Sequence, residues 1–455
     1  MIDSILRALG EIKADVARHL EASLVTQVCR ELNYVWRDRI LDPVTTVHAF
    51  LLQVLHGNTA CDHVPQLIGK KFSGEAYGQA RARLPLELFR RLLGGVCESL
   101  AGCREEAARW CGHRVWLVDG SSCSMPDTPE LQAAFGQPGG QRPGCGFPVA
   151  HLLTLFHAGT GLLQEVLIAP LRTHDMSQVA EVHPHLEPGD VLVADRGFCS
   201  FVHLALLVRA AAHGVFRVHQ RVVVDFRRGR LHRPARATHP IFRDATGLPR
   251  SAWIRWQGHW DHVVEYFKPA RRPRWMTAEA FAALPDVLEV REVRYTIGRR
   301  GFRTRTVELV TTLLDPTAYP LAELAQLYYD RWRIEVNLRH LKQTLHLDVL
   351  RSKTVVGVEK EIRMLALVYN LVRLVMLRSA ELQHAPVERV SFVDALRWLM
   401  HGGDRRRLPA LVTHPLRPDR FEPRVRKRRP KEYDLMNRPR LELKRQLPAT
   451  QRHAT

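Results

Sequence analysis

A change in hydrophobic spacing near residue 113 constrains the fold of this chain more than any other feature. Over residues 1–110, apolar residues recur every three or four positions, which is typical of amphipathic helices. Beyond that point, short Val- and Leu-rich runs alternate with Gly and Pro, which predicts strands at 113–120, 147–158, 161–169, 191–198 and 215–219. Helical stretches at 176–186 and 201–214 separate the last three runs. This order predicts an all-α N-terminal domain followed by a mixed α/β layer.

The second half of the chain is less regular. Residues 220–315 combine Arg-rich stretches with strand-like runs, which predicts a basic, β-rich insertion. Pro320 favours the first turn of a helix that we expect to continue through Leu345, with more helices to about residue 400. The expected units are an all-α domain (1–110), the first part of an α/β core (111–219), the insertion (220–315), the second part of the core (316–400) and a basic tail (401–455).

The charge of the chain is high and unevenly distributed. Lys and Arg number 67 against 47 Asp and Glu, which gives a net charge of +20. Residues 201–310 carry 21 basic and 9 acidic groups, residues 402–455 carry 16 and 6, whereas residues 101–200 carry 6 and 11. A generally basic composition would raise the charge evenly, so this segregation indicates a polyanionic partner, namely nucleic acid. The nearly neutral helices of 1–110 are then expected to form a DNA-binding domain that reads bases.

Several other classes of protein are excluded by composition. The eight cysteines form no CxxC pair and the 23 histidines no HExxH motif, which argues against a disulfide scaffold and a zinc site. The first twenty residues mix acids and bases and lack the apolar segment of a signal peptide. The most apolar later stretch, 364–377, is interrupted by Arg373 and is too short to span a bilayer. The sequence therefore predicts a soluble, cytoplasmic protein without a membrane partner.

Two carboxylates follow strand-like runs directly. Asp119 comes after Val-Trp-Leu-Val and Asp195 after Val-Leu-Val-Ala, where a buried carboxylate is unfavourable unless it is paired or bound to a metal. Two or three such acids at the carboxyl ends of strands can hold the divalent cations that catalyse phosphodiester cleavage. Each Asp also suits the start of an ordinary turn, so either residue alone is open to that simpler interpretation.

A third charged group lies on the helix after Pro320. Tyr328, Arg331, Glu335 and Lys342 are spaced by 3, 4 and 7 residues and fall on a stripe about 60° wide, with Arg339 beside it. The adjoining apolar face would pack on the sheet, so Glu335 would reach the strand ends while the cations face a bound phosphate backbone. The alternative is a solvated helix face that is stabilised by pairs four residues apart.

In this order, the three elements resemble those of the DDE transposases of bacterial insertion sequences, specifically the insertion-sequence-4 family. That family's glutamate helix carries Tyr, two residues, Arg, three residues, Glu, six residues and Lys, and residues 328–342 match every fixed position. The segments VDGS at 118–121 and GDVLVADRGF at 189–198 look like the two aspartate motifs, and 427–440 is similar to the family's tail. The resemblance covers about residues 113–440.

The resemblance implies an RNase H-like core interrupted by a β-rich insertion. Asp119, Asp195 and Glu335 would then be the catalytic residues and would bind Mg²⁺, with Mn²⁺ as a substitute. The implied activity is nicking of double-stranded DNA at transposon ends and strand transfer into target DNA, by a homodimer on DNA. The implied DNA contacts are Tyr328, Arg331, Arg339 and Lys342. Relatives that form hairpin ends use a Trp of the insertion to hold a flipped base, but no Trp of this chain stands on the strand leading into the glutamate helix, and we assign none.

Two other functions remain open at the level of sequence. One is a Mg²⁺-dependent nuclease on the same fold, which the helix signature argues against. The other is a catalytically inactive, transposase-derived DNA-binding protein, which the presence of all three carboxylates argues against.

Overall fold

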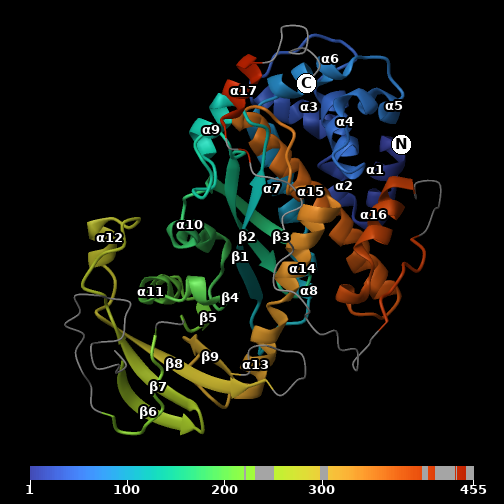
Figure 1. Ribbon diagram of the computed structural model, residues 1–455. Coiled ribbons are helices and arrows are strands. Elements are labelled where there is room, and N and C mark those ends of the chain that lie inside the picture. The colour runs from blue at the N-terminus through green and yellow to red at the C-terminus, as the bar shows by residue number, and fades with distance from the viewer. Residues whose placement is uncertain are drawn as a thin grey trace.

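The computed structural model describes residues 1–219, 222–230, 251–297, 306–401, 408–415, 436 and 438–446. It shows a mixed α/β protein in which a nine-stranded sheet follows a helical N-terminal region (Figure 1). The N-terminal helices are α1 (Ile2–Ile12), α2 (Ala14–Arg18), α3 (Ala22–Glu31), α4 (Pro43–Leu55), α5 (Val64–Ile68), α6 (Gly74–Arg83), α7 (Leu86–Ser99) and α8 (Ala101–Glu106). Local signals position them: Asp42 caps α4 by accepting the Thr45 N–H at 2.6 Å, and Pro43 follows at the first helical position.

The N-terminal helices share their apolar core with the long helix α15 (Val355–Leu382). Helices α4 and α7 pack directly against α15, and buried polar contacts join the two regions. The Asn58 amide donates to the Glu361 carboxylate at 2.7 Å, and the Lys360 ammonium donates to the carbonyl oxygens of Arg81 and Ala82 at 3.3 and 2.8 Å. Residues 1–110 therefore do not have a core of their own.

Five strands form the first part of the sheet, in the order β3-β2-β1-β4-β5. Strands β1 (Val115–Ser124), β2 (Val149–His157) and β3 (Leu163–Pro170) form an antiparallel meander. Strand β4 (Val191–Ala194) lies parallel to β1, and β5 (His213–Arg217) lies parallel to β4. Each of the five predicted strand runs overlaps an observed strand, because each is a short apolar segment near turn residues. The run expected at 191–198 was too long: the strand ends at Ala194, and Arg196–Phe198 form a 3-10 turn.

The two faces of these strands pack against different helices. Val115 and Leu117 of β1 lie in the core that contains α15 and the N-terminal helices. Trp116 and Val118 point the other way, into a second core with α10 (Asp175–Val182) and α11 (Phe201–Arg209). Figure 1 shows α10 and α11 on one side of β1 and β4, and α15 on the other. Because both faces are covered, the strands read as continuous apolar runs rather than as alternating ones.

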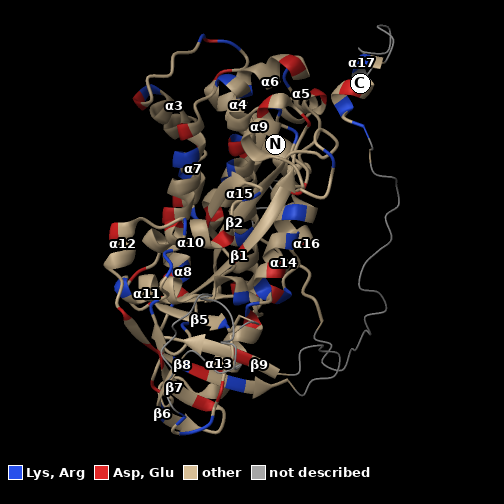
Figure 2. Ribbon diagram, turned by 60° about the vertical axis from the view of Figure 1, so that its left-hand side comes forward, with Lys and Arg blue, Asp and Glu red and all other residues tan. Residues whose placement is uncertain are grey.

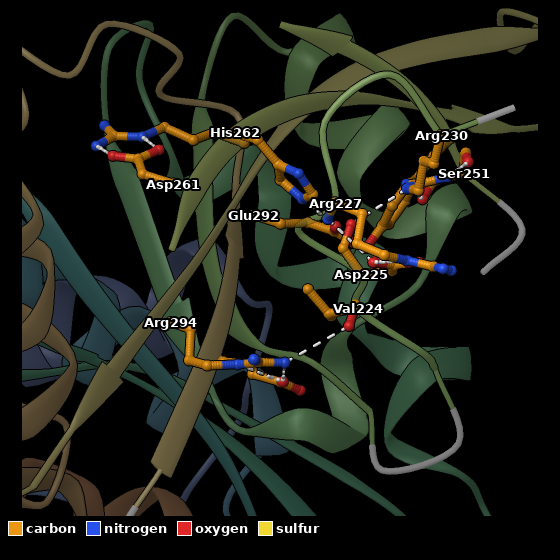
Figure 3. Close-up of polar contacts among 12 residues, drawn as sticks. Val224, Asp225, Arg227, Arg230, Ser251, Asp261, His262, Glu292 and Arg294 are labelled. Atoms are coloured by element: carbon orange, nitrogen blue, oxygen red, sulfur yellow. Dashed lines mark hydrogen bonds and ion pairs between the residues drawn. The ribbon is translucent and has the colours of Figure 1, made fainter. Parts of the chain in front are cut away.

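The basic, β-rich segment continues the same sheet. Strands β6 (Ala252–Gly258), β7 (Asp261–Phe267), β8 (Val287–Thr296) and β9 (Thr306–Thr311) are antiparallel, and β9 joins them to the core by pairing with β5. A short helix, α12 (Ala278–Ala282), lies between β7 and β8. Figure 3 shows the buried polar contacts that hold these strands: Arg291 pairs with Asp261, and His262 lies 2.8 Å from the Glu292 carboxylate.

The helix expected to continue from Pro320 through Leu345 is broken, and this part of the prediction was wrong. Pro320 is the residue before α13 (Leu321–Asp330), which is followed by α14 (Arg333–Arg339) and a π-helical turn (His340–Thr344). At the joint, the backbone N–H groups of Arg331 and Trp332 bond to carbonyls three residues back, at 3.3 and 3.2 Å, instead of four. A pattern of side chains cannot report such local tightening, since the apolar positions stay buried on both sides of the joint.

The remaining elements are α9, α16 and α17. Helix α9 (Pro129–Phe135) lies in the Pro- and Gly-rich stretch between β1 and β2. Helices α16 (Phe392–His401) and α17 (Arg440–Gln446) follow α15, and Arg440 pairs with Asp127 at 3.3 Å. Most of the predicted basic tail, including 416–435, lies outside the described residues, as do 231–250 of the insertion. Among the helices that are described, none has the length and apolarity needed to cross a membrane.

Candidate active site

Asp119 and Asp195 stand at equivalent positions of two parallel neighbouring strands. Leu117 of β1 is paired with Val193 of β4, and each aspartate comes two residues after its member of this pair. Asp119 lies within β1, where its carboxylate accepts the Gly120 N–H at 2.9 Å. Asp195 follows β4 and accepts the Gly197 N–H at 2.7 Å. The parallel register therefore brings both acids to the same edge of the sheet.

The chain segment with α13 and α14 is fixed to β1 at both of its ends. Before the segment, the Tyr319 hydroxyl lies 2.8 Å from Nε2 of His113, which directly precedes β1. After it, the Ser124 N–H at the end of β1 donates to the carbonyl oxygen of Asp348 at 2.9 Å. Between these points α14 packs beside β1 (Figures 1 and 2). The segment thus runs along β1 from start to end and passes Asp119 on the way.

Arg331 joins the helical segment to the strand. Its guanidinium lies 4.0 Å from the Asp119 carboxylate and 3.4 Å from that of Glu335. The Arg331 side chain is only 9% exposed and lies 5.6 Å from the rings of both Tyr328 and Trp332. Asp119 and Glu335, which are 216 positions apart in sequence by subtraction of their numbers, therefore flank one buried cation.

The negative charges of Asp195 and Glu335 act on Asp119. Burial raises the pKa of Asp119 from 3.8 to about 6; Arg331 opposes this rise, while the negative charges of Asp195 and Glu335 add to it. Burial likewise raises the pKa of Tyr328, and Asp195 contributes to that rise against the effect of Arg331. Asp119, Asp195, Glu335 and Tyr328 thus share one electrostatic environment with Arg331.

The other residues of the helix signature occupy different surroundings. Tyr328 is buried, together with Leu327, Ile334, Leu338 and Leu341 of the face that was expected to pack on the sheet. Burial raises the pKa of the Cys123 thiol on β1, and Lys342 in the π-helical turn is close enough to oppose that rise. Arg339 is exposed at the end of α14.

A second pair beside Asp119 was not assigned from the sequence. The Asp175 carboxylate, at the start of α10, lies 2.8 Å from Nε2 of His151 on β2. A Cβ atom on Gly120 would come within 2.4 Å of the Asp175 carboxylate, so any larger residue directly after Asp119 would displace that side chain. The sequence signals that could have found this pair are the Asp-Gly step at 119–120 and the dipeptide His174–Asp175.

The donor set of the site fits a divalent cation. Within the described ranges, no three His, Cys, Asp or Glu side chains already stand close enough together to hold a metal ion. However, Asp119, Asp195 and Glu335 supply the oxygen ligands that Mg²⁺ prefers, and their mutual repulsion in a partly buried site is what a cation relieves. The residues therefore fit a metal by their chemistry and their charge.

The chain is similar to a known protein family, to a characterised protein and to a solved structure. The sequence profile of the family described as "Transposase DDE domain" matches residues 110–371, a range that contains Asp119, Asp195 and Glu335. Transposase InsG for insertion sequence element IS4 of Escherichia coli (strain K12) is 27% identical over 375 residues, which cover 78% of this chain and 76% of InsG. Among solved structures, the cryo-EM structure of the piggyBac transposase synaptic complex with hairpin DNA matches with a TM-score of 0.45 and 10% identity, over 83% of this chain and 76% of that chain.

Proposed function

The chain belongs to the transposase DDE domain family, and we propose that it is an active insertion-sequence transposase, which nicks DNA at transposon ends and transfers the freed 3′-hydroxyl to target DNA. One observation carries the proposal. Asp119 and Asp195 lie in register on parallel strands, and Arg331 of the glutamate helix lies between Asp119 and Glu335. The similarity to a transposase of an insertion sequence supports the same substrate class.

We further assign an RNase H-like fold to the core. The support is the strand order β3-β2-β1-β4-β5, in which an antiparallel meander is followed by two parallel strands. Helices α10 and α11 cover one face of these strands and α15 covers the other. In this assignment, β6–β9 form the insertion between the second aspartate and the glutamate helix.

The proposed mechanism gives each residue a role that follows from its surroundings. Asp119, Asp195 and Glu335 would hold Mg²⁺ or Mn²⁺, which supplies a polarised phosphodiester and an activated nucleophile when it is bound. Arg331 and Lys342 would place the DNA backbone by charge, and the buried Tyr328 would support Arg331. Arg339, exposed on α14, would contact DNA farther from the reacting phosphate.

The rest of the molecule would bind DNA around this site. The segments 201–310 and 402–455 carry the excess positive charge and would contact phosphates, whereas the helices of 1–110 would read the end sequence. Two copies of the chain on DNA would bring two ends together. Because 1–110 shares its core with α15, end recognition belongs to the full chain rather than to a separable module.

The proposal is tested with the full chain and a labelled duplex that carries the element's own terminal sequence. We expect Asp119→Asn, Asp195→Asn and Glu335→Gln to abolish Mg²⁺-started nicking and joining while end binding in gel shifts is kept. Glu323→Gln removes an exposed carboxylate from the first turn of α13 and is the matched control, with unchanged nicking.

Three outcomes would contradict the proposal. A Glu335→Gln protein that still nicks would remove Glu335 from the site. A wild-type protein that nicks but never joins ends to target DNA would be a nuclease of the same fold. A wild-type protein that binds ends and shows neither reaction would be the inactive DNA-binding form.

A further inference from the structure

Arg331 is buried without being well satisfied. Its two contacts to carboxylates measure 4.0 Å to Asp119 and 3.4 Å to Glu335, and its Nε has no hydrogen-bond partner among the described residues although it is buried. Arg114, a buried arginine with a structural role, has closer contacts than Arg331. Its side chain is 8% exposed and donates to both carboxylate oxygens of Asp190, at 2.9 and 3.0 Å. The loose geometry of Arg331 therefore leaves donors available for another anion.

The position of Arg331 makes it a competitor for a metal. Its positive charge lies between two carboxylates that the proposed function assigns to metal binding. The guanidinium carbon lies 5.6 Å from the ring centres of Tyr328 and Trp332, and the Arg331 side chain is shielded from water. At such distances in a partly buried site, a fixed cation strongly disfavours the approach of a second one.

We infer that Arg331 takes the place of the divalent cation in the free protein. Its guanidinium neutralises the carboxylates of Asp119 and Glu335 until DNA binds, and then contacts a DNA phosphate instead. This inference rests on the proposed function. A phosphate offers the fork of the guanidinium two oxygens, so that bound DNA releases Asp119 and Glu335 for the metal. The binding of DNA then raises the affinity for the metal, and the protein without DNA binds the metal weakly.

The test measures Mn²⁺ binding by the full chain without DNA, from the electron paramagnetic resonance signal of free Mn²⁺. Arg331→Gln removes the charge and keeps hydrogen-bonding groups, and we expect it to bind Mn²⁺ about tenfold more tightly than the wild type. Arg331→Lys keeps the charge and should bind as weakly as the wild type. The matched control is Arg333→Gln, which removes a cation two residues away, at the start of α14, that pairs with Asp330 and Glu388. It should leave Mn²⁺ affinity unchanged.

A second arm adds duplex DNA with the element's terminal sequence. DNA should raise the Mn²⁺ affinity of the wild type several-fold, because the phosphate takes over Arg331, and should leave that of Arg331→Gln unchanged. This arm needs only the wild type for its main result, so it stands even if Arg331→Gln folds poorly by circular dichroism.

The outcomes separate this inference from the proposed function. If Arg331→Gln folds and binds Mn²⁺ no more tightly than the wild type, while Asp119→Asn loses Mn²⁺, the metal site stands and the inferred role of Arg331 is refuted. Equal Mn²⁺ affinity of the wild type with and without DNA refutes it as well. If Asp119→Asn binds Mn²⁺ like the wild type, the proposed metal site itself is refuted.

Discussion

Replacing Asp119 by Asn should stabilise the folded protein at neutral pH while removing its activity. Burial and the neighbouring carboxylates raise the pKa of Asp119 from 3.8 to about 6, so the charged form is less stable in the folded state than in the unfolded chain. A shift of about two pKa units corresponds to ~3 kcal/mol at pH 7.5. The side-chain oxygen of Asn can still accept the Gly120 N–H, and Arg331 still pairs with Glu335. The substitution therefore removes little stabilising interaction.

The sign of the pH dependence follows from the direction of the shift. Because the folded pKa lies above the unfolded one, the folded protein is not penalised below pH 3.8, and the penalty grows until the pH exceeds about 6. The advantage of Asp119→Asn should therefore fall to ~1.5 kcal/mol at pH 5. For a chain of 455 residues, ~3 kcal/mol corresponds to about 3 °C in melting temperature, which thermal denaturation in EDTA resolves.

A buried aspartate of the same sheet provides the control with the opposite sign. Asp190 accepts from Arg114 and from the Trp116 indole at 2.8 Å, so Asp190→Asn leaves a buried arginine under-paired and should lose roughly 3 kcal/mol. An Asp119→Asn protein that melts below the wild type at pH 7.5, or whose advantage does not change between pH 7.5 and pH 5, would refute the reasoning.

Three further predictions test the packing and the charge of the molecule. Gly120→Ala should lose ~1–3 kcal/mol in denaturant unfolding, because its Cβ would meet the Asp175 carboxylate, and a second change, Asp175→Ala, should restore part of that loss. A fragment of residues 1–110 should show less helix by circular dichroism than the same residues have in the full chain, since the face that packs on α15 is left exposed to water; a cooperative, fully helical fragment would show that the region folds alone. Removing residues 420–455, which carry 12 basic and 4 acidic groups, should lower the slope of log affinity against log salt by ~0.9 for each lost phosphate contact, and an unchanged slope would show that the tail does not bind phosphates.

The sequence predicts the core strands well because strands that are buried on both faces are continuous apolar runs. Runs such as 191–194 are apolar, short and enclosed by turn residues, and a carboxylate that directly follows such a run is unfavourable unless it is paired or bound to a metal. The same reasoning fails where local backbone geometry determines the position of a side chain. Arg331 was expected to face DNA from one continuous helix, but it lies at the joint after α13, with its guanidinium 4.0 Å from the Asp119 carboxylate. The two residues are 212 positions apart in sequence, by subtraction of residue numbers, and no local pattern encodes their contact.

The pairing of β9 with β5 explains how 140 residues can separate Asp195 from Glu335 without moving Glu335 away from the site. Strand β9 is antiparallel to β5, so it carries the chain from the edge with the aspartates back to the opposite edge of the sheet. There Tyr319 contacts His113 at the start of β1, and α13 and α14 return along β1 toward Asp119. The length of the segment between β5 and β9 does not enter this geometry, because only the last strand sets where the helix begins. An insertion of different size that still ended in a strand paired with β5 would deliver Glu335 to the same place.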